Sequence, residues 1–330
     1  MLAMVFSCSK NEQSSDTPVY NEGIYNPAKK IVEVTMDDKK ENWTWEGDLL
    51  TRVETIAEKG SATVFRYDGS RVTSIRPGSD RYGFDEIKVV YNGNAMSELL
   101  FYVLNRQVAK AVLRHNGEGK IDHADIQVDN EYVNNIISTL SLVFKDGGKL
   151  RKAVPTKLSV GSSVITVDLT WTGSNVSRAI ILTYIEGEAS GSEIASFVEL
   201  ASQFMEIPSE YTSVLSVLVG SDLIPYTVDV KDTLDYSYDG NPNPLQGYMG
   251  DMSVAVLSAN NIVGQQTHCT LNGSLTMNLP FFGERTYNLP HTFAPKSVTH
   301  RYTYTPDNYP QTVTSDDGET QQVTTYTYAN

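Results

Sequence analysis

One motif recurs along this chain and limits what it can fold into. An alternating strand ends on a ring-bearing residue, a turn rich in Asp, Asn and Gly follows, and a second alternating strand begins. The ring-bearing residues Trp45, Tyr67, Tyr91 and His115 lie 22 to 24 residues apart, a spacing that fits two strands and two turns. Asp-Gly and Asn-Gly supply the positive-φ residues that a two-residue hairpin turn requires. The repeat therefore predicts a series of antiparallel hairpins.

Later segments repeat the motif more loosely. They are Phe144–Leu150, Ile165–Val176, Tyr236–Asn241 and Tyr302–Asn308, and the chain ends on the alternating segment Val323–Tyr328. Apolar residues at every second position line one face of a sheet. The predicted fold class is therefore all-β: one large antiparallel sheet of repeated hairpins, curled into a partial or closed barrel.

The main interruption of this pattern begins at Ser190. Ser190 and Glu193 have capping-box spacing, and apolar residues at helical spacing follow them. We expect a small helical insertion near residues 190–219. A second helix over Ser209–Val219 stays open because of its β-branched residues, and Asn130–Leu140 is similarly ambiguous.

Size and charge narrow the function classes. With 330 residues and 40% apolar composition, the chain is long enough to bury a full core. Its formal net charge of -14 repels phosphate backbones, so we expect no nucleic-acid partner. After the N-terminus, no apolar run reaches the roughly 18 residues of a membrane-spanning helix.

The N-terminus resembles the end of a bacterial lipoprotein signal. Cys8 follows Ser7, a small residue, and a short apolar run that starts at Met1. Acyl chains on such a cysteine give stable membrane anchoring when two or more are present. The run is shorter than the apolar core of a signal peptide, so we expect the true start codon to lie upstream. The alternative is a chance cysteine near the start of a cytosolic chain.

This interpretation predicts three parts. Residues 1–8 are a truncated signal with the lipidated Cys8, residues 9–29 are a flexible polar tether, and residues 30–330 are a single β domain. The expected location is the outer membrane, with outer-membrane lipid as the partner of the acylated cysteine. Whether the domain faces the cell surface or the periplasm stays open.

Two segments carry a resemblance to a known family. Tyr236–Leu245 (YSYDGNPNPL) and Ala259–Val263 (ANNIV) resemble a Bacteroidetes lipoprotein family, a domain of unknown function described as having a porin-like fold. Tyr67–Gly69, Tyr302–Tyr304 and the strand at Trp171 fit the same family. The resemblance covers about residues 30 to 330 and implies a large curled sheet and a cell-envelope location, but no activity. The Tyr-Asp repeats also resemble polymorphic-toxin shells, whose arrays are usually far longer.

Two carboxylate-containing groups are the nearest approach to a metal site. They are His123 with Asp125 and Asp129, and Asp235 with Asp239 and Asn241. The first could hold a divalent ion, although a solvated polar strand face explains it too. The second approaches a calcium-loop composition without the full ligand run, and turn chemistry explains it better. We predict no metal site, no cofactor and no catalytic residues.

Paired tyrosines are the candidate ligand-contacting residues. Tyr302 and Tyr304, and Tyr326 and Tyr328, each point to one face of a strand. Exposed aromatic rows can stack on sugar rings, and a concave sheet can hold a lipid or glycan. The alternative is cross-strand packing, which stabilises a sheet by about 0.2–1 kcal/mol per pair.

Three functions remain open from the sequence. The preferred one is a non-catalytic envelope lipoprotein that binds a glycan or a protein partner or has a structural role. The second is a carrier of a lipophilic ligand inside the curled sheet, and the third is an envelope hydrolase whose site forms only in the fold. A transmembrane barrel is disfavoured because the strands carry Lys, Arg and Asp freely and the C-terminus lacks a terminal aromatic residue.

Overall fold

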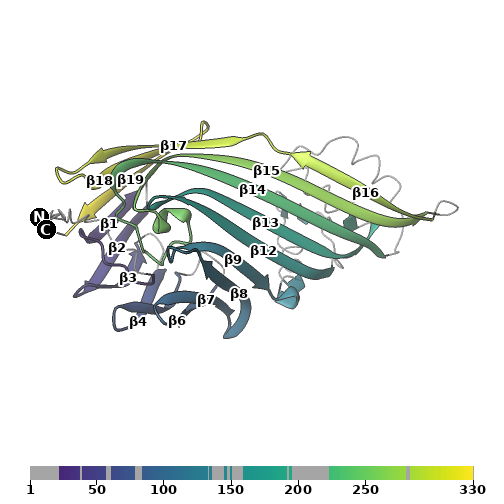
Figure 1. The fold of residues 1–330 in the computed structure, drawn as a ribbon, viewed down its shortest axis with the longest axis horizontal. Coiled ribbons are helices and arrows are strands. Elements are labelled where there is room, and N and C mark those ends of the chain that lie inside the picture. The colour runs from purple at the N-terminus through teal and green to yellow at the C-terminus, as the bar shows by residue number, and fades with distance from the viewer. Residues whose placement is uncertain are drawn as a thin grey trace, which may run out of the picture.

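The computed structural model of the chain is an elongated β structure. It describes residues 22–37, 39–56, 61–78, 84–132, 134–135, 145–146, 149–150, 159–191, 193–194, 223–279 and 283–329. Short strands gather at one end and long strands extend away from it (Figure 1).

Antiparallel strands account for almost all of the described secondary structure. In chain order they are β1 (Ile31–Met36), β2 (Lys39–Glu46), β3 (Leu49–Thr55), β4 (Ala62–Asp68), β5 (Arg71–Arg76), β6 (Glu86–Asn92), β7 (Ala95–Val103), β8 (Arg106–His115), β9 (Ile121–Val128), β10 (Lys145–Asp146), β11 (Lys149–Leu150), β12 (Ser159–Thr172), β13 (Asn175–Ser190), β14 (Leu223–Pro242), β15 (Asn260–Leu279), β16 (Gly283–Thr292), β17 (Lys296–Tyr304), β18 (Pro310–Asp316) and β19 (Gln321–Tyr328). One 3-10 helix, η1 (Val254–Leu257), lies between β14 and β15.

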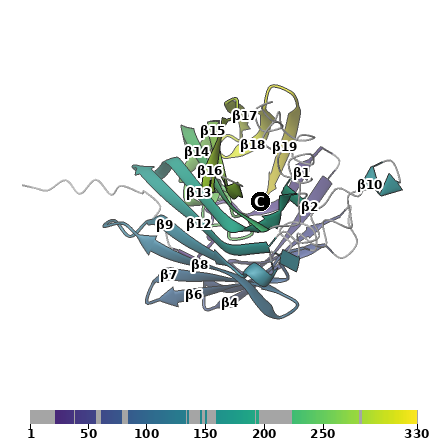
Figure 2. The same cartoon turned by 90° about the vertical axis from the view of Figure 1, so that its right-hand side faces the viewer.

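The main sheet closes on itself. Chain neighbours pair along it, β9 pairs with β12, and β1 pairs with both β2 and β19. β15 pairs with β17 over Gly264–Thr267 and with β16 over Thr270–Leu279. β16 and β17 therefore share one position, and the 17 strands occupy 16 positions around the barrel. Figure 2 views the strands around its interior. The predicted antiparallel sheet of hairpins is confirmed, and it is a closed barrel.

The repeated motif has one local structure. Trp45, Tyr67 and Tyr91 each lie at a register shift immediately before a turn, and the glycine two residues later has φ of 59°, 60° or 61°. A bulge adds one residue and strengthens the local twist, and a positive φ is available to glycine without a Cβ clash. The motif therefore ends one strand and returns the next in register.

The ring of each motif also binds the backbone of the preceding strand. Trp45 Nε1 donates to Ile31 O at 2.7 Å, Tyr67 Oη to Leu50 O at 2.6 Å, and Tyr91 Oη to Val72 O at 2.7 Å. The same bond recurs on later strands: Trp171 to Ile121 at 2.8 Å, Tyr238 to Val176 at 2.6 Å, Tyr302 to Ile262 at 2.8 Å and Tyr328 to Pro310 at 2.7 Å. The aromatic residues of the repeat thus join adjacent hairpins.

One predicted turn is wrong. The Asp239-Gly240 pair does not end a strand, because β14 continues through it to Pro242. The pairing with β15 shifts register in this stretch. There the Asp239 carboxylate accepts hydrogen bonds from the backbone N–H groups of Asn241 at 3.0 Å and Asn261 at 3.2 Å. These bonds replace backbone–backbone hydrogen bonds where the ladder is interrupted.

The expected helical insertion is described only at its start. Ser190 and Glu193 form the predicted capping box, with Ser190 N donating to Glu193 Oε2 at 2.8 Å and Glu193 N donating to Ser190 Oγ at 3.4 Å. The ambiguous segment after β9 is helical where it begins, at Asn130. The rest of both segments, including Ser209–Val219, lies outside the described residues.

The two faces of the barrel differ in polarity. On β12 the side chains of Ile165, Val167 and Leu169 face inward, and Leu169 packs against the buried core. The outward-facing residues along the ladder are mostly threonine, serine or charged, with ion pairs such as Lys110 Nζ to Glu98 at 2.5 Å and Arg178 to Asp235 at 2.6 Å. A membrane-spanning barrel has the opposite polarity, since its outer band is apolar. The outer face of this barrel is suited to water.

Candidate functional site

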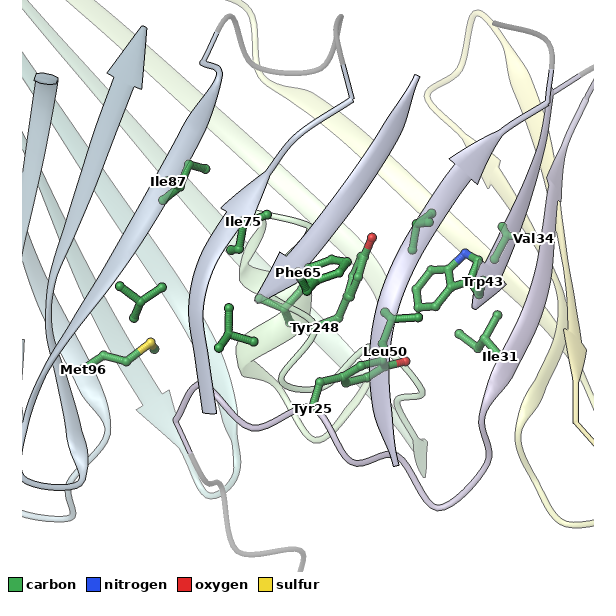
Figure 3. Close-up of a cluster of buried hydrophobic side chains, with 14 of the residues drawn as sticks. Tyr25, Ile31, Val34, Trp43, Leu50, Phe65, Ile75, Ile87, Met96 and Tyr248 are labelled. Atoms are coloured by element: carbon green, nitrogen blue, oxygen red, sulfur yellow. The ribbon is translucent and has the colours of Figure 1, made fainter. Parts of the chain in front are cut away.

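The short-stranded end of the barrel is filled by a hydrophobic core, which we call the filled end. Its members come from inner faces of the strands, from the segment before β1 and from the loop between β14 and β15 (Figure 3). The Tyr248 ring lies 4.6 Å from the ring of Trp43 and 5.9 Å from that of Phe65. Tyr25 Oη donates to Pro244 O at 2.8 Å. These residues pack against one another across this end of the barrel.

The segment before β1 is bound to the barrel wall at this end. The Glu22 carboxylate accepts from Met96 N at 2.6 Å and bonds His115 Nε2 at 2.7 Å. Val72 N donates to Gly23 O at 2.9 Å. The packed domain thus includes Glu22 to Tyr25, which lie before the predicted boundary at residue 30 and inside the expected tether.

The inner face of the long strands is different. It carries aliphatic side chains that stay half-buried, which we call the inner lining: Ile165, Val167, Ile181, Val228, Val230, Leu234 and Leu271. The register of the ladder places Val167 beside Ile181, and Val230 beside Leu271. These side chains alternate with the polar outer residues of the same strands, so they face the barrel interior without being fully covered.

A second buried cluster lies beyond the inner lining. It contains Ala189, Ile194, Tyr226, Leu275 and Met277. On β14, the inner lining runs from Val228 to Leu234, between Tyr226 of this cluster and Tyr238 toward the filled end. At about 3.3 Å per residue that stretch is about 20 Å long. The interior therefore offers an elongated, accessible apolar surface between two packed regions.

Asp232 and Cys269 are a polar pair on the inner face beside this lining. They lie opposite each other on β14 and β15. Burial, together with a hydrogen bond to Asp232, raises the pKa of the Cys269 thiol to about 11. At neutral pH the group is a protonated, weakly nucleophilic thiol.

The outer face of the same strands carries a groove of about 440 Å³, which we call the outer groove. Two cross-strand rows form it: Val164, Tyr184, Asp229, Asn272 and Pro290 in one, and Thr166, Leu182, Lys231, Thr270 and Thr292 in the other. Val164 is 43% exposed and Leu182 41%. Solvent-facing apolar groups are here surrounded by hydrogen-bonding side chains.

The predicted group around His123 is only partly assembled. His123 Nδ1 bonds Asp168 Oδ1 at 2.6 Å and Nε2 bonds Asp125 Oδ1 at 2.9 Å, while Arg114 pairs with Asp125. Asp129 instead pairs with Arg106 at 2.6 Å. The hydrogen bonds to Asp168 and Asp125 raise the pKa of His123, so the group is an ion-pair chain on the outer face. Among the described residues no set of three metal-ligating side chains is placed to hold an ion.

The second predicted group is split between the two faces. Asp235 faces outward and pairs with Arg178 at 2.6 Å. Asp239 lies on the inner side, where its carboxylate accepts from the Asn261 side chain at 3.2 Å and from the Tyr304 hydroxyl. Its role is therefore to organise the backbone.

The four candidate tyrosines lie on the inner face. Tyr302 and Tyr304 stack with ring centroids 5.9 Å apart. Tyr326 and Tyr328 pack against the core of the filled end, and burial raises the pKa of Tyr326 to about 12. These contacts are packing contacts within the protein. The ligand-stacking role of the four tyrosines therefore stays a prediction. Cys8 lies outside the described residues.

The sequence pattern missed the outer groove. Val164 and Leu182 are outward-facing apolar residues on strands whose other outward residues are mostly polar, and only the register of those strands brings them together. Helical segments in the described part of the chain include none long and apolar enough to cross a membrane.

Comparison with known proteins adds a likeness in fold. No family model matches the chain, and no curated protein matches it. Among solved structures the chain is similar to a porin-like protein from Bacteroides uniformis ATCC 8492, with 10% sequence identity and a TM-score of 0.42, over 94% of this chain and 100% of that one. At this identity and TM-score the likeness assigns neither a family nor a function.

Proposed function

We propose that the protein is a non-catalytic envelope lipoprotein that carries an elongated apolar ligand in the long-stranded part of its barrel. The observation that supports this function most is the inner lining, whose aliphatic side chains face the interior yet stay half-buried. The outer face of the same strands is mostly polar, so the apolar surface of these strands lies mainly on their interior side.

The energetics favour such a ligand. Removing apolar surface from water stabilises by about 25 cal/mol per Å². A ligand that covers 100 Å² of the inner lining would thus gain about 2.5 kcal/mol from the protein side alone. A small number of polar groups in an apolar site fixes the orientation of a ligand, and Asp232 is a polar residue beside this lining.

The alternative of an envelope hydrolase has less support. Such an enzyme needs paired acid and base groups in its concavity. Asp232 bonds the Cys269 thiol, and the clustered His123, Asp125 and Asp168 lie on the outer face. We therefore retain the prediction that the protein is not an enzyme.

The proposed location is the outer membrane, with Cys8 as the lipid anchor. The lipobox-like sequence before Cys8 supports it, and the polar outer face is suited to a barrel that is attached to the membrane but surrounded by water. The test is Cys8→Ala in the native host. Loss of acyl labelling and release from the membrane fraction are expected, and unchanged partitioning would remove the anchor.

The ligand is tested with Nile red, a neutral dye whose fluorescence rises in apolar surroundings. Ile181→Gln places an amide in the inner lining, whereas Leu182→Gln makes the same change one residue along, on the outer face. We expect the first variant to weaken binding by about tenfold, or about 1.4 kcal/mol, and the second to leave it unchanged. Equal effects, or no binding by the native protein, would contradict the carrier function. Thermal unfolding of both variants checks that the fold is kept.

A further inference from the structure

The outer groove has features that the proposed carrier function does not use. Asp229 and Lys231 form no ion pair among the described residues, and both are exposed. Asn272 lies opposite Asp229 on the adjacent strand. The groove therefore presents an anionic acceptor, a cationic donor and an amide beside the exposed aliphatic groups of Val164 and Leu182.

We propose that the outer groove binds a neutral polysaccharide chain. A sugar ring exposes C–H groups on its faces and hydroxyl groups around its edge, so it needs an apolar floor next to mixed donors and acceptors. Leu182 and Val164, with the ring of Tyr184, supply the floor. Asp229, Lys231 and Asn272 supply the donors and acceptors at its margin.

The shape of the groove favours a chain over a single sugar. A second depression of about 440 Å³ lies farther along the same strands. The outward-facing residues that line it are Glu186, Glu188, Thr227, Ser274 and Thr276. From Leu182 to Glu188 along β13 the two depressions extend over about 20 Å, at 3.3 Å per residue. Several consecutive sugar units fit such a length.

Other polymers fit this surface less well. Asp229, Glu186 and Glu188 outnumber Lys231, and the chain carries a net charge of -14, so nucleic acids and other polyanions are repelled. A peptide that adds as a strand needs an open sheet edge, whereas β13 and β14 at the centre of the groove have a partner on both sides.

The proposal is tested by affinity electrophoresis of the whole chain through gels that contain dextran, starch, xylan or galactomannan. We expect retardation by at least one of them. Asp229→Asn and Leu182→Gln should each weaken it about tenfold, while Ile181→Gln, on the opposite face, and Glu319→Gln, an exposed carboxylate in a distant turn, should not. Should Leu182→Gln fail to fold, Asp229→Asn still decides.

Three results would overturn this inference. They are no retardation by any of the four polysaccharides, retardation that both groove substitutions leave intact, and binding only to cationic polymers such as polylysine that disappears in high salt. The last would identify the groove as an acidic patch with general affinity for cations. Because the inner lining is tested with Nile red, the two sites can fail independently.

Discussion

The barrel interior has two regions that are built from the same kind of alternating strand but differ in how deeply their inward-facing side chains are buried. At the filled end, Leu50 is 1% exposed and Ile31 0%. Along the long strands, inward-facing Val230 and Leu271 are half-buried. The strand pattern alone does not produce this difference, because both regions alternate apolar and polar residues.

The difference in burial depends on what fills the interior of the barrel in each region. At the filled end the segment Glu22–Tyr25 and the loop that carries Tyr248 and Val256 supply the packing that the strands lack. The long strands have buried clusters at the two ends of the inner lining but half-buried side chains between them. A closed barrel can therefore combine a region that provides stability with a region that is available to a ligand.

The largest expected effect compares one substitution in the two regions. Leu50→Ala should lower the free energy of unfolding by about 3 to 4 kcal/mol, because it creates a cavity in a closely packed core. Leu271→Ala should lower it by about 1 kcal/mol, because the side chain is only half-buried. Chemical denaturation of both variants measures the difference. Equal losses would mean that the inner lining is packed as tightly as the filled end.

The segment before β1 is tested by Gly23→Ala. Gly23 has φ of 71°, and a Cβ there would lie 1.8 Å from Tyr91 Oη. Gly93 has a similar φ of 61° with nothing within 4 Å of its Cβ position. Gly93→Ala should cost about 1 kcal/mol for the left-handed backbone alone, and Gly23→Ala about 2 to 3 kcal/mol. If the two losses were equal, the segment would not pack against the wall in solution.

Removal of one hydroxyl sharpens the contrast between the faces. Tyr67→Phe deletes the donor to Leu50 O and should cost about 1 kcal/mol. Tyr102 lies on the outer face, where Lys88 Nζ lies over its ring, 4.5 Å from the ring centroid. Tyr102→Phe should be neutral to within about 0.5 kcal/mol. Thermal unfolding is sufficient to separate the two, and a larger loss at Tyr102 would reverse the assignment of faces.

The smallest effect is a pair of opposite histidine titrations. Hydrogen bonds to Asp168 and Asp125 raise the pKa of outward-facing His123, whereas burial lowers that of inward-facing His300. The His123 contribution to stability is present below about pH 6.5 and is lost as pH rises through its folded-state pKa. Protonation of His300 opposes folding, so its cost appears as pH falls below about 6.5.

Two measurements check these signs. The NMR titration midpoints should lie above about 6.5 for His123 and below it for His300. His123→Asn should lose more stability at about pH 5.5 than at about pH 8.5, and His300→Asn less. Midpoints in the opposite order would contradict the polarity of the two faces.

The sequence could predict what depends on local pattern. The hairpins at Trp45, Tyr67 and Tyr91 and the capping box at Ser190 all follow from residues within a short stretch. The contacts between segments far apart in the sequence do not. Glu22 binds His115 across 93 residues, and His123 bonds Asp168 across 45. Local periodicity places residues on a face but does not say which distant strand lies beside them.

At Asp239-Gly240 the local sequence pattern predicted a turn that the structure does not have. The pair has the composition of a turn, yet long-range bonds to Asn261 and Tyr304 hold it in β14. Tertiary contacts thus overrode a local preference. The same limit applies to the outer groove, which depends on the register of five strands.

Cysteine accessibility at two adjacent positions of β14 tests the central claim most directly. Val230→Cys and Lys231→Cys, each in a Cys8→Ser and Cys269→Ser background, place a thiol on the inner and outer face of one strand. Both should react with a water-soluble maleimide in the free protein, and saturating Nile red should protect position 230 alone. Protection at position 231, or at neither position, would show that the inner lining is not the ligand site.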